Sequence, residues 1–93
     1  MTERIILLQN TTLRFFQNKQ QIKTITINQI EELFSCGIIT EKSALIYCIK
    51  KEYYEMLKGS DISHRSAVID LTIRWDVSKN YIERLIYKKR DKN

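Results

Sequence analysis

The sequence predicts a mainly α-helical fold, and three observations support this prediction. The 93 residues include no proline and only two glycines, so few residues interrupt a helix. From residue 28 onward, apolar side chains recur at the three- and four-residue spacing of amphipathic helices. Thr40 and Ser63 precede two of these periodic segments, and their hydroxyl groups favour a helix start.

The N-terminal segment, residues 1–27, fits two kinds of structure. A helix would place four residues on one side, namely Ile5, Leu8, Thr12 and Phe15. Consecutive bulky residues and the stretch NTT fit strands nearly as well. Residues 23–27, KTITI, alternate with a period of two, which is typical of a short strand or an extended connector. We therefore expect an accessory segment, residues 1–40, that begins with a helix or short strands.

The next two elements have clearer helical patterns. Asn28 followed by Glu31 has the spacing of a capping box, and the short helix after it stops near Gly37. Thr40 can cap a longer helix over residues 41–58, which Gly59 closes. The apolar surface expected to face the core on this helix comprises Leu45, Cys48, Ile49 and Met56, with Tyr53 and Leu57 beside them.

Ser63 can cap a further helix that ends at Trp75. Its helical period groups Val68, Leu71, Thr72 and Trp75 on one flank. Ile69 and Ile73 lie on a second flank, roughly 100 to 140° away at about 100° per residue. A helix that is apolar on two flanks should pack against two partners. The expected partners are the 41–58 helix and the segment that follows residues 76–78.

The last periodic segment, SKNYIERLIYKKR, has two faces of different chemistry. Ile82, Leu85 and Ile86 form the inward stripe, and Asn80, Arg84 and Tyr87 point almost directly away from it, with Glu83 and Lys88 on the flanks. An amide, a guanidinium and a phenol can reach base edges and phosphates in a major groove. Ser78 and Lys79 stand at the helix start, where free backbone N–H groups and the helix dipole favour a phosphate.

The positive charge is concentrated near the end of the sequence. The formal net charge is +5 at pH 7, and residues 84–93 contain five basic side chains against one acidic one, a local charge of +4. A basic stretch beside an amphipathic helix attracts polyanions, chiefly nucleic acid or an acidic membrane surface. The alternative is a solvated tail that keeps the protein soluble.

Residues 68–87, VIDLTIRWDVSKNYIERLIY, resemble the helix-turn-helix unit of DNA-binding proteins. The matching residues are Leu71 and Trp75 in the first helix, Val77 and Ser78 at the turn, and Ile82 and Leu85 in the second helix. The family usually has a small residue in place of Thr72 and glycine in place of Asp76. The resemblance extends over residues 41–90 if the 41–58 helix precedes the pair in a three-helix unit. It implies recognition roles for Ser78, Lys79, Asn80, Glu83, Arg84 and Tyr87.

We therefore expect a mainly α single compact domain, with an accessory or dimerisation segment over residues 1–40 and a helix-turn-helix unit over residues 41–93. The expected function is sequence-specific binding of duplex DNA by a homodimer, as a small transcription regulator or a mobile-element accessory factor. The residues expected to read bases are Asn80, Glu83, Arg84 and Tyr87, and those expected to hold phosphates are Ser78, Lys79, Lys88, Lys89 and Arg90. The alternative is an adaptor whose basic helical face binds an acidic protein partner.

Other chemistry has little support in the sequence. Cys36 and Cys48, with His64 as the only histidine, lack the paired spacing of a structural zinc site, so we expect two buried thiols and no metal. No phosphate-binding glycine loop or nucleophile setting indicates an enzyme or a cofactor. No apolar run approaches the roughly 20 residues that span a bilayer, and the start MTERIILLQN lacks the features of a secretory signal. We expect a cytoplasmic protein.

Overall fold

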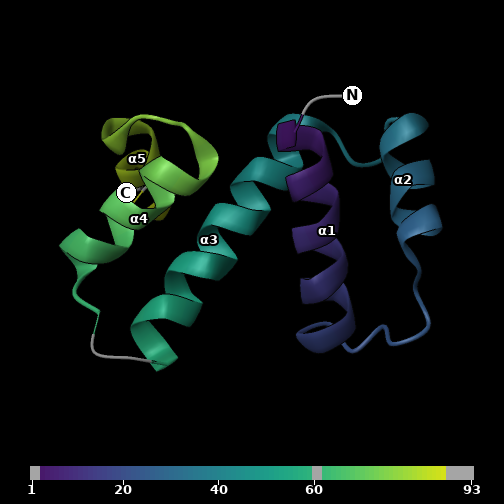
Figure 1. The fold of residues 1–93 in the computed structure, drawn as a ribbon, viewed down its shortest axis with the longest axis horizontal. Helices are drawn as coiled ribbons and strands as arrows, with labels where there is room; N and C mark the ends of the chain where they lie inside the picture. Colours follow the sequence, from purple (N-terminus) through teal and green to yellow (C-terminus); the bar gives the residue numbers. More distant parts are fainter. Residues whose placement is uncertain (1–2, 60–61, 88–93) are drawn as a thin grey trace. The chain divides into compact units, whose positions relative to one another are not determined.

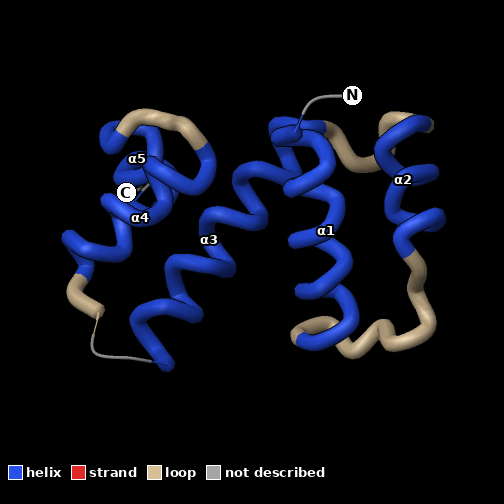
Figure 2. Tube along the Cα trace, in the orientation of Figure 1, coloured by secondary structure: helices blue, strands red, loops and turns tan. Residues whose placement is uncertain are grey.

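The computed structural model describes residues 3–59 and 62–87, and the described residues form five helices without a strand (Figures 1 and 2). The mainly α-helical prediction is therefore confirmed. The chain divides into two compact units, Met1–Cys48 and Ile49–Asn93, which we call unit 1 and unit 2. The boundary lies inside α3, which spans Glu41–Gly59, so this helix contributes its first part to unit 1 and its second part to unit 2.

Unit 1 begins with a helical hairpin. Helix α1 spans Glu3–Asn18, and α2, which spans Ile27–Ser35, runs back alongside it (Figure 1). Leu8, Thr12 and Phe15 are buried on one side of α1, as the helical alternative predicted for this segment requires. The strand alternative is wrong because the buried side chains recur every three to four residues, which only a helix places on one face. The KTITI stretch is neither a strand nor a continuous extended connector: Lys23 and Thr24 lie in a turn, and Ile27 is the first residue of α2.

Helix α2 starts two residues earlier than the sequence suggested. The N-cap is Thr26, whose hydroxyl accepts a hydrogen bond from the Gln29 backbone N–H at 3.3 Å. The Gln29 side chain accepts in return from the Thr26 N–H at 2.9 Å, which completes a capping box. The predicted box of Asn28 and Glu31 is therefore wrong: Thr26 has the extended backbone that a cap requires, whereas Asn28 already lies inside the helix.

The first part of α3 completes the core of unit 1. Thr40 caps this helix as predicted, since its hydroxyl accepts from the Ser43 N–H at 3.1 Å. The Tyr47 ring makes edge-to-face contacts with the two phenylalanines of α1, Phe15 and Phe16, at centroid distances of 6.1 and 5.9 Å. The other buried side chains that α2 and α3 contribute to this core are Ile30, Ala44, Leu45 and Cys48.

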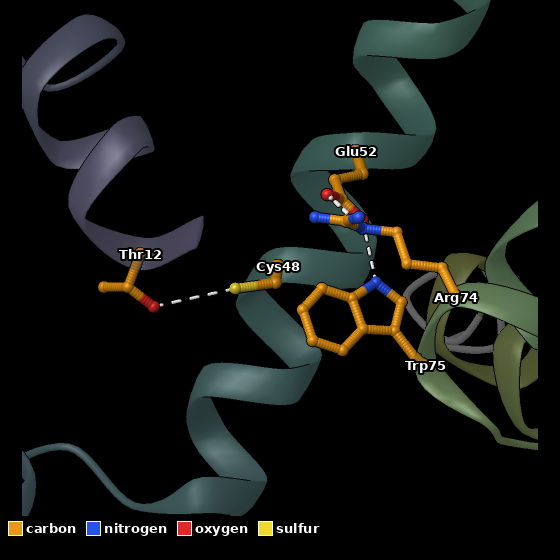
Figure 3. Close-up of polar contacts among 5 residues, drawn as sticks. All are labelled: Thr12, Cys48, Glu52, Arg74 and Trp75. Atoms are coloured by element: carbon orange, nitrogen blue, oxygen red, sulfur yellow. Dashed lines mark hydrogen bonds and ion pairs between the residues drawn. The ribbon is translucent and has the colours of Figure 1, made fainter. Parts of the chain in front are cut away.

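The two cysteines have different environments. Cys48 is fully buried, and its sulfur lies 3.6 Å from the Thr12 hydroxyl oxygen (Figure 3). Cys36 is exposed, so the prediction of two buried thiols is correct for Cys48 and wrong for Cys36. The reason is that Cys36 is the C-cap of α2 and lies beyond the last residue of the helical apolar face. The two cysteines do not form a disulfide with each other.

Unit 2 contains the second part of α3, helix α4 over His64–Trp75 and helix α5 over Lys79–Tyr87. Ser63 caps α4 as predicted, accepting from the Ser66 N–H at 3.2 Å. The buried apolar side chains of this unit come from all three helices: Ile49, Tyr53, Ala67, Val68, Leu71, Trp75, Ile82 and Ile86.

One packing prediction for α4 is wrong. Ile69 and Ile73 were expected to contact a second helix, but they are 47% and 76% exposed. The buried residues of α4 are Ala67, Val68, Leu71 and Trp75. Only this flank of α4 is therefore buried, and the flank that carries the two isoleucines faces solvent.

The two capping assignments for α2 can be separated by mutation. We expect Thr26→Ala to lower the free energy of unfolding by about 1 kcal/mol, because it leaves the Gln29 N–H without its acceptor. Asn28→Ala is the matched control and should change it by less than about 0.5 kcal/mol. Thermal unfolding followed by circular dichroism measures both. A larger loss for Asn28→Ala would contradict the Thr26 assignment.

Candidate functional site

The candidate site is built on the turn between α4 and α5. The two helices and the three-residue connection predicted from the sequence are present, with Asp76, Val77 and Ser78 between Trp75 and Lys79. Asp76 caps α4 in the left-handed region, at φ 55° and ψ 52°, and its N–H donates to the Thr72 carbonyl. Aspartate adopts this conformation more readily than most residues, which explains how the chain turns here without glycine.

Ser78 starts α5. Its hydroxyl accepts from the Tyr81 N–H at 3.0 Å, and its carbonyl accepts from the Ile82 N–H at 3.2 Å. Among the described residues, no hydrogen bond engages the backbone N–H groups of Lys79 and Asn80. These two groups are first-turn donors that point along the helix axis, so the start of α5 has donors available for an anion.

The two faces of α5 differ as the sequence predicted. Ile82 and Ile86 are buried, and Leu85 beside them is half-buried. Asn80 and Arg84 are exposed on the opposite side, and within residues 3–59 and 62–87 no hydrogen bond or ion pair engages either side chain. Ser78 and Lys79 are exposed as well, and Glu83 is half-buried. The amide and the guanidinium, one helical turn apart, are thus presented to solvent by a helix whose other face is packed.

The structure gives Tyr87 a partner that the sequence did not indicate. Its hydroxyl lies 2.8 Å from Nε2 of His64, the first residue of α4. Nδ1 of the same imidazole lies 2.8 Å from the hydroxyl of Tyr53, on α3. His64 therefore bridges two tyrosines and connects the end of α5 to the start of α4. Sequence reasoning missed this cluster because its members are 11 and 23 residues apart and share no periodic pattern.

A buried carboxylate holds the other end of α4. Glu52, on α3, is 5% exposed. One carboxylate oxygen accepts from the Trp75 indole N–H at 2.7 Å, and the other accepts from the Arg74 Nε–H at 2.8 Å (Figure 3). The last two residues of α4 are thereby bound to α3, immediately before the turn that leads to α5.

The position of Glu52 in the sequence carries a signal of its burial. Glu52 follows Cys48 by four residues and Ile49 by three, so helical geometry places it on the apolar face of α3. A carboxylate in that position is seldom buried without a partner, and Trp75 and Arg74 are suitable donors.

The remaining predicted phosphate contacts, Lys88, Lys89 and Arg90, lie outside the described residues. Among the residues that the structure describes, no group of three or more His, Cys, Asp or Glu side chains could hold a metal ion. None of the described helices is both long enough and apolar enough to cross a membrane. Comparisons with protein families, with curated proteins and with solved structures found no match for this chain.

The role of Glu52 can be tested by removing its carboxylate. We expect Glu52→Ala to lower the free energy of unfolding by about 2 to 3 kcal/mol, because the buried Trp75 N–H loses its acceptor. The contact with Arg74 adds less, since that side chain is 38% exposed and can be solvated.

Urea denaturation followed by the fluorescence of Trp75, the only tryptophan, measures this loss within unit 2. Glu31→Ala, which removes an exposed carboxylate of α2, is the matched control and should have little effect. Equal effects of the two substitutions would show that the Glu52 contacts do not stabilise unit 2.

Proposed function

We propose that unit 2 binds duplex DNA as a helix-turn-helix, with α5 as the recognition helix in the major groove. The observation that carries the proposal is the arrangement of α5. Asn80 and Arg84 are exposed opposite the buried Ile82 and Ile86, on a helix that follows α4 after only three residues. A helix that projects polar side chains from a packed support is the geometry that major-groove readers use.

Arg84 and Asn80 are the proposed base-reading residues of this helix. An arginine guanidinium can donate two hydrogen bonds to O6 and N7 of guanine, and an asparagine amide can pair with N6 and N7 of adenine. Because neither side chain has a partner among the described residues, binding DNA would not require an internal contact to be broken. Glu83, on the flank of this face, can accept a hydrogen bond from cytosine N4.

Tyr87 is proposed to contact DNA through its ring and not through its hydroxyl group. Its hydroxyl is bonded to His64, and the residue is 36% exposed. We propose that the exposed part of its ring makes an apolar contact, for which a thymine methyl group is the suitable partner. The bond to His64 would then hold the end of α5 while the ring lies against the base.

Phosphate contacts would position the helix in the groove. The Ser78 hydroxyl already accepts from Tyr81, yet its own proton remains a donor for a phosphate oxygen. The Lys79 ammonium and the backbone N–H groups of Lys79 and Asn80 lie at the same end of α5. Lys88, Lys89 and Arg90 would add charge at the opposite end, a role that rests on the sequence alone.

A protein with these properties would serve as a small transcription regulator or as an accessory factor of a mobile element. The two roles require the same event, recognition of a short DNA sequence. Experiments on DNA binding by α5 therefore test the step that the two roles share.

The base-reading role of Arg84 can be tested on a site selected from a random duplex pool. Arg84→Ala should weaken binding to the selected site by about 1 to 3 kcal/mol and relax the sequence preference at one position. Arg84→Lys is the matched variant: it keeps the charge but lacks the two-pronged donor, so discrimination should fall while binding to random DNA persists.

Fluorescence anisotropy on the selected duplex and on a scrambled one measures these effects. An equal loss on both duplexes would assign Arg84 to the phosphates. If the wild-type chain enriches no sequence and binds weakly at low salt, the proposal fails, and an acidic protein partner becomes the better explanation of the basic surface.

The basic C-terminal residues should determine the salt dependence. Replacing Lys88, Lys89 and Arg90 with alanine should reduce the slope of log affinity against log salt by about 1 for each phosphate contact that is lost. A control variant with alanine at the exposed Lys23, Lys42 and Lys58 removes the same charge elsewhere. The same change of slope in both variants would indicate a general charge effect and no localised contact.

A further inference from the structure

The outward side of α3 in unit 2 carries basic side chains on both sides of a tyrosine. Lys50, Tyr54 and Lys58 follow one another at four-residue steps, so they lie close to one line along the helix. Tyr54 and Lys58 are exposed, and Lys50 is half-buried. We call these three residues the α3 row. At a rise of about 1.5 Å per residue, the row is about 12 Å long.

The charge on this side of α3 is positive. Lys51 and Glu55 flank the row, so the outward side over residues 50–58 has three lysines and one glutamate, a net formal charge of +2. Within the described parts of the chain, Lys50 and Lys58 make no hydrogen bond or ion pair. A group of cations without internal partners attracts a polyanion.

Tyr54 provides an aromatic surface between the two lysines. The residue is 48% exposed, and its ring contacts the ring of Tyr53 edge to face, with 5.3 Å between the centroids and 71° between the planes. Such a contact occupies at most one face of the Tyr54 ring. Because Tyr53 is itself buried and bonded to His64, the Tyr54 ring rests on a packed side chain.

We propose that the α3 row binds a single-stranded segment of nucleic acid, with a base stacked on Tyr54 and phosphates on Lys50 and Lys58. An aromatic ring among basic side chains suits this partner, because every base has a π-face and every nucleotide brings a phosphate. In a duplex the bases are already paired and stacked on one another, so the ring would find no base face. An acidic peptide would pair with the lysines but would leave the Tyr54 ring without a stacking partner.

The α3 row is a surface separate from the outward face of α5. Helix α4 packs on the other side of α3, through the bonds that Glu52 and Tyr53 make with it. At about 100° per residue, Tyr54 points about 150° away from the direction midway between Glu52 and Tyr53. The row therefore faces away from α4, and the inference does not rest on DNA binding by α5. With both surfaces occupied, unit 2 would hold a duplex and a single strand at once.

Fluorescence anisotropy of the full chain with a labelled oligothymidine strand tests the stacking. Tyr54→Ala should weaken binding of the strand roughly 5- to 100-fold, the usual loss when one base loses its aromatic partner. Tyr54→Phe is the matched variant: it keeps the ring, so strand binding should stay within about twofold of the wild type. Circular dichroism confirms that both variants are folded.

The same strand annealed to oligoadenine separates this surface from the α5 site. Tyr54→Ala should leave duplex binding unchanged, and Arg84→Ala should leave strand binding unchanged. Equal losses of strand and duplex in Tyr54→Ala, or a loss in Tyr54→Phe as large as in Tyr54→Ala, overturn the stacking. Absence of strand binding by the wild type at low salt overturns the inference, whatever α5 does with duplex DNA.

The lysines of the row can be tested through the salt dependence. The double variant Lys50→Ala/Lys58→Ala should reduce the slope of log affinity for the strand against log salt by about 0.7 for each phosphate contact that is lost. Lys23→Ala/Lys42→Ala removes the same charge from exposed positions in unit 1 and should leave the slope unchanged. The same change in both double variants overturns the localised contact. Displacement of the strand by an oligoglutamate of equal charge, as effective as displacement by unlabelled strand, overturns the inference in favour of an acidic protein partner.

Discussion

The buried carboxylate of Glu52 is the contact on which the arrangement of unit 2 most depends. A carboxylate that is 5% exposed must be paired, because its desolvation is otherwise too costly. The donors are the side chains of Trp75 and Arg74, the last two residues of α4. The next residue, Asp76, begins the turn to α5. The Glu52 carboxylate therefore holds the last turn of α4 against α3, immediately before the left-handed Asp76 turns the chain toward α5.

The other end of α5 is held by a separate set of contacts. Ile82 and Ile86 pack into the core, and Tyr87 bonds to His64, which also bonds to Tyr53. The turn thus contacts the start of α5 and the imidazole contacts its end. The outward direction of its polar row follows from this packing, and the proposed base reading would benefit from such a preorganised support.

The two sides of helix α4 have different environments, since one is buried in the core and the other is exposed. One side supplies Val68, Leu71 and Trp75 to the core, and the other carries exposed isoleucines. The sequence shows the two apolar flanks equally well, because periodicity reports only which residues share a face. Which flank is covered depends on where α3 and α5 pack. The isoleucine flank of α4 is thus left exposed when unit 2 folds.

The sequence by itself determined the local features of this protein. Caps at Thr40 and Ser63, the helices that follow them, and the opposite faces of α5 can all be derived from spacing within a few residues, because capping and amphipathicity are local effects. The tertiary structure decided between alternatives that the spacing of residues in the sequence leaves open. Bulky pairs in α1 fitted helix and strand alike, and both Thr26 and Asn28 precede a suitable partner residue by three positions. The contacts of Glu52 and of His64 join residues 11 to 23 positions apart, and only packing brings such residues together.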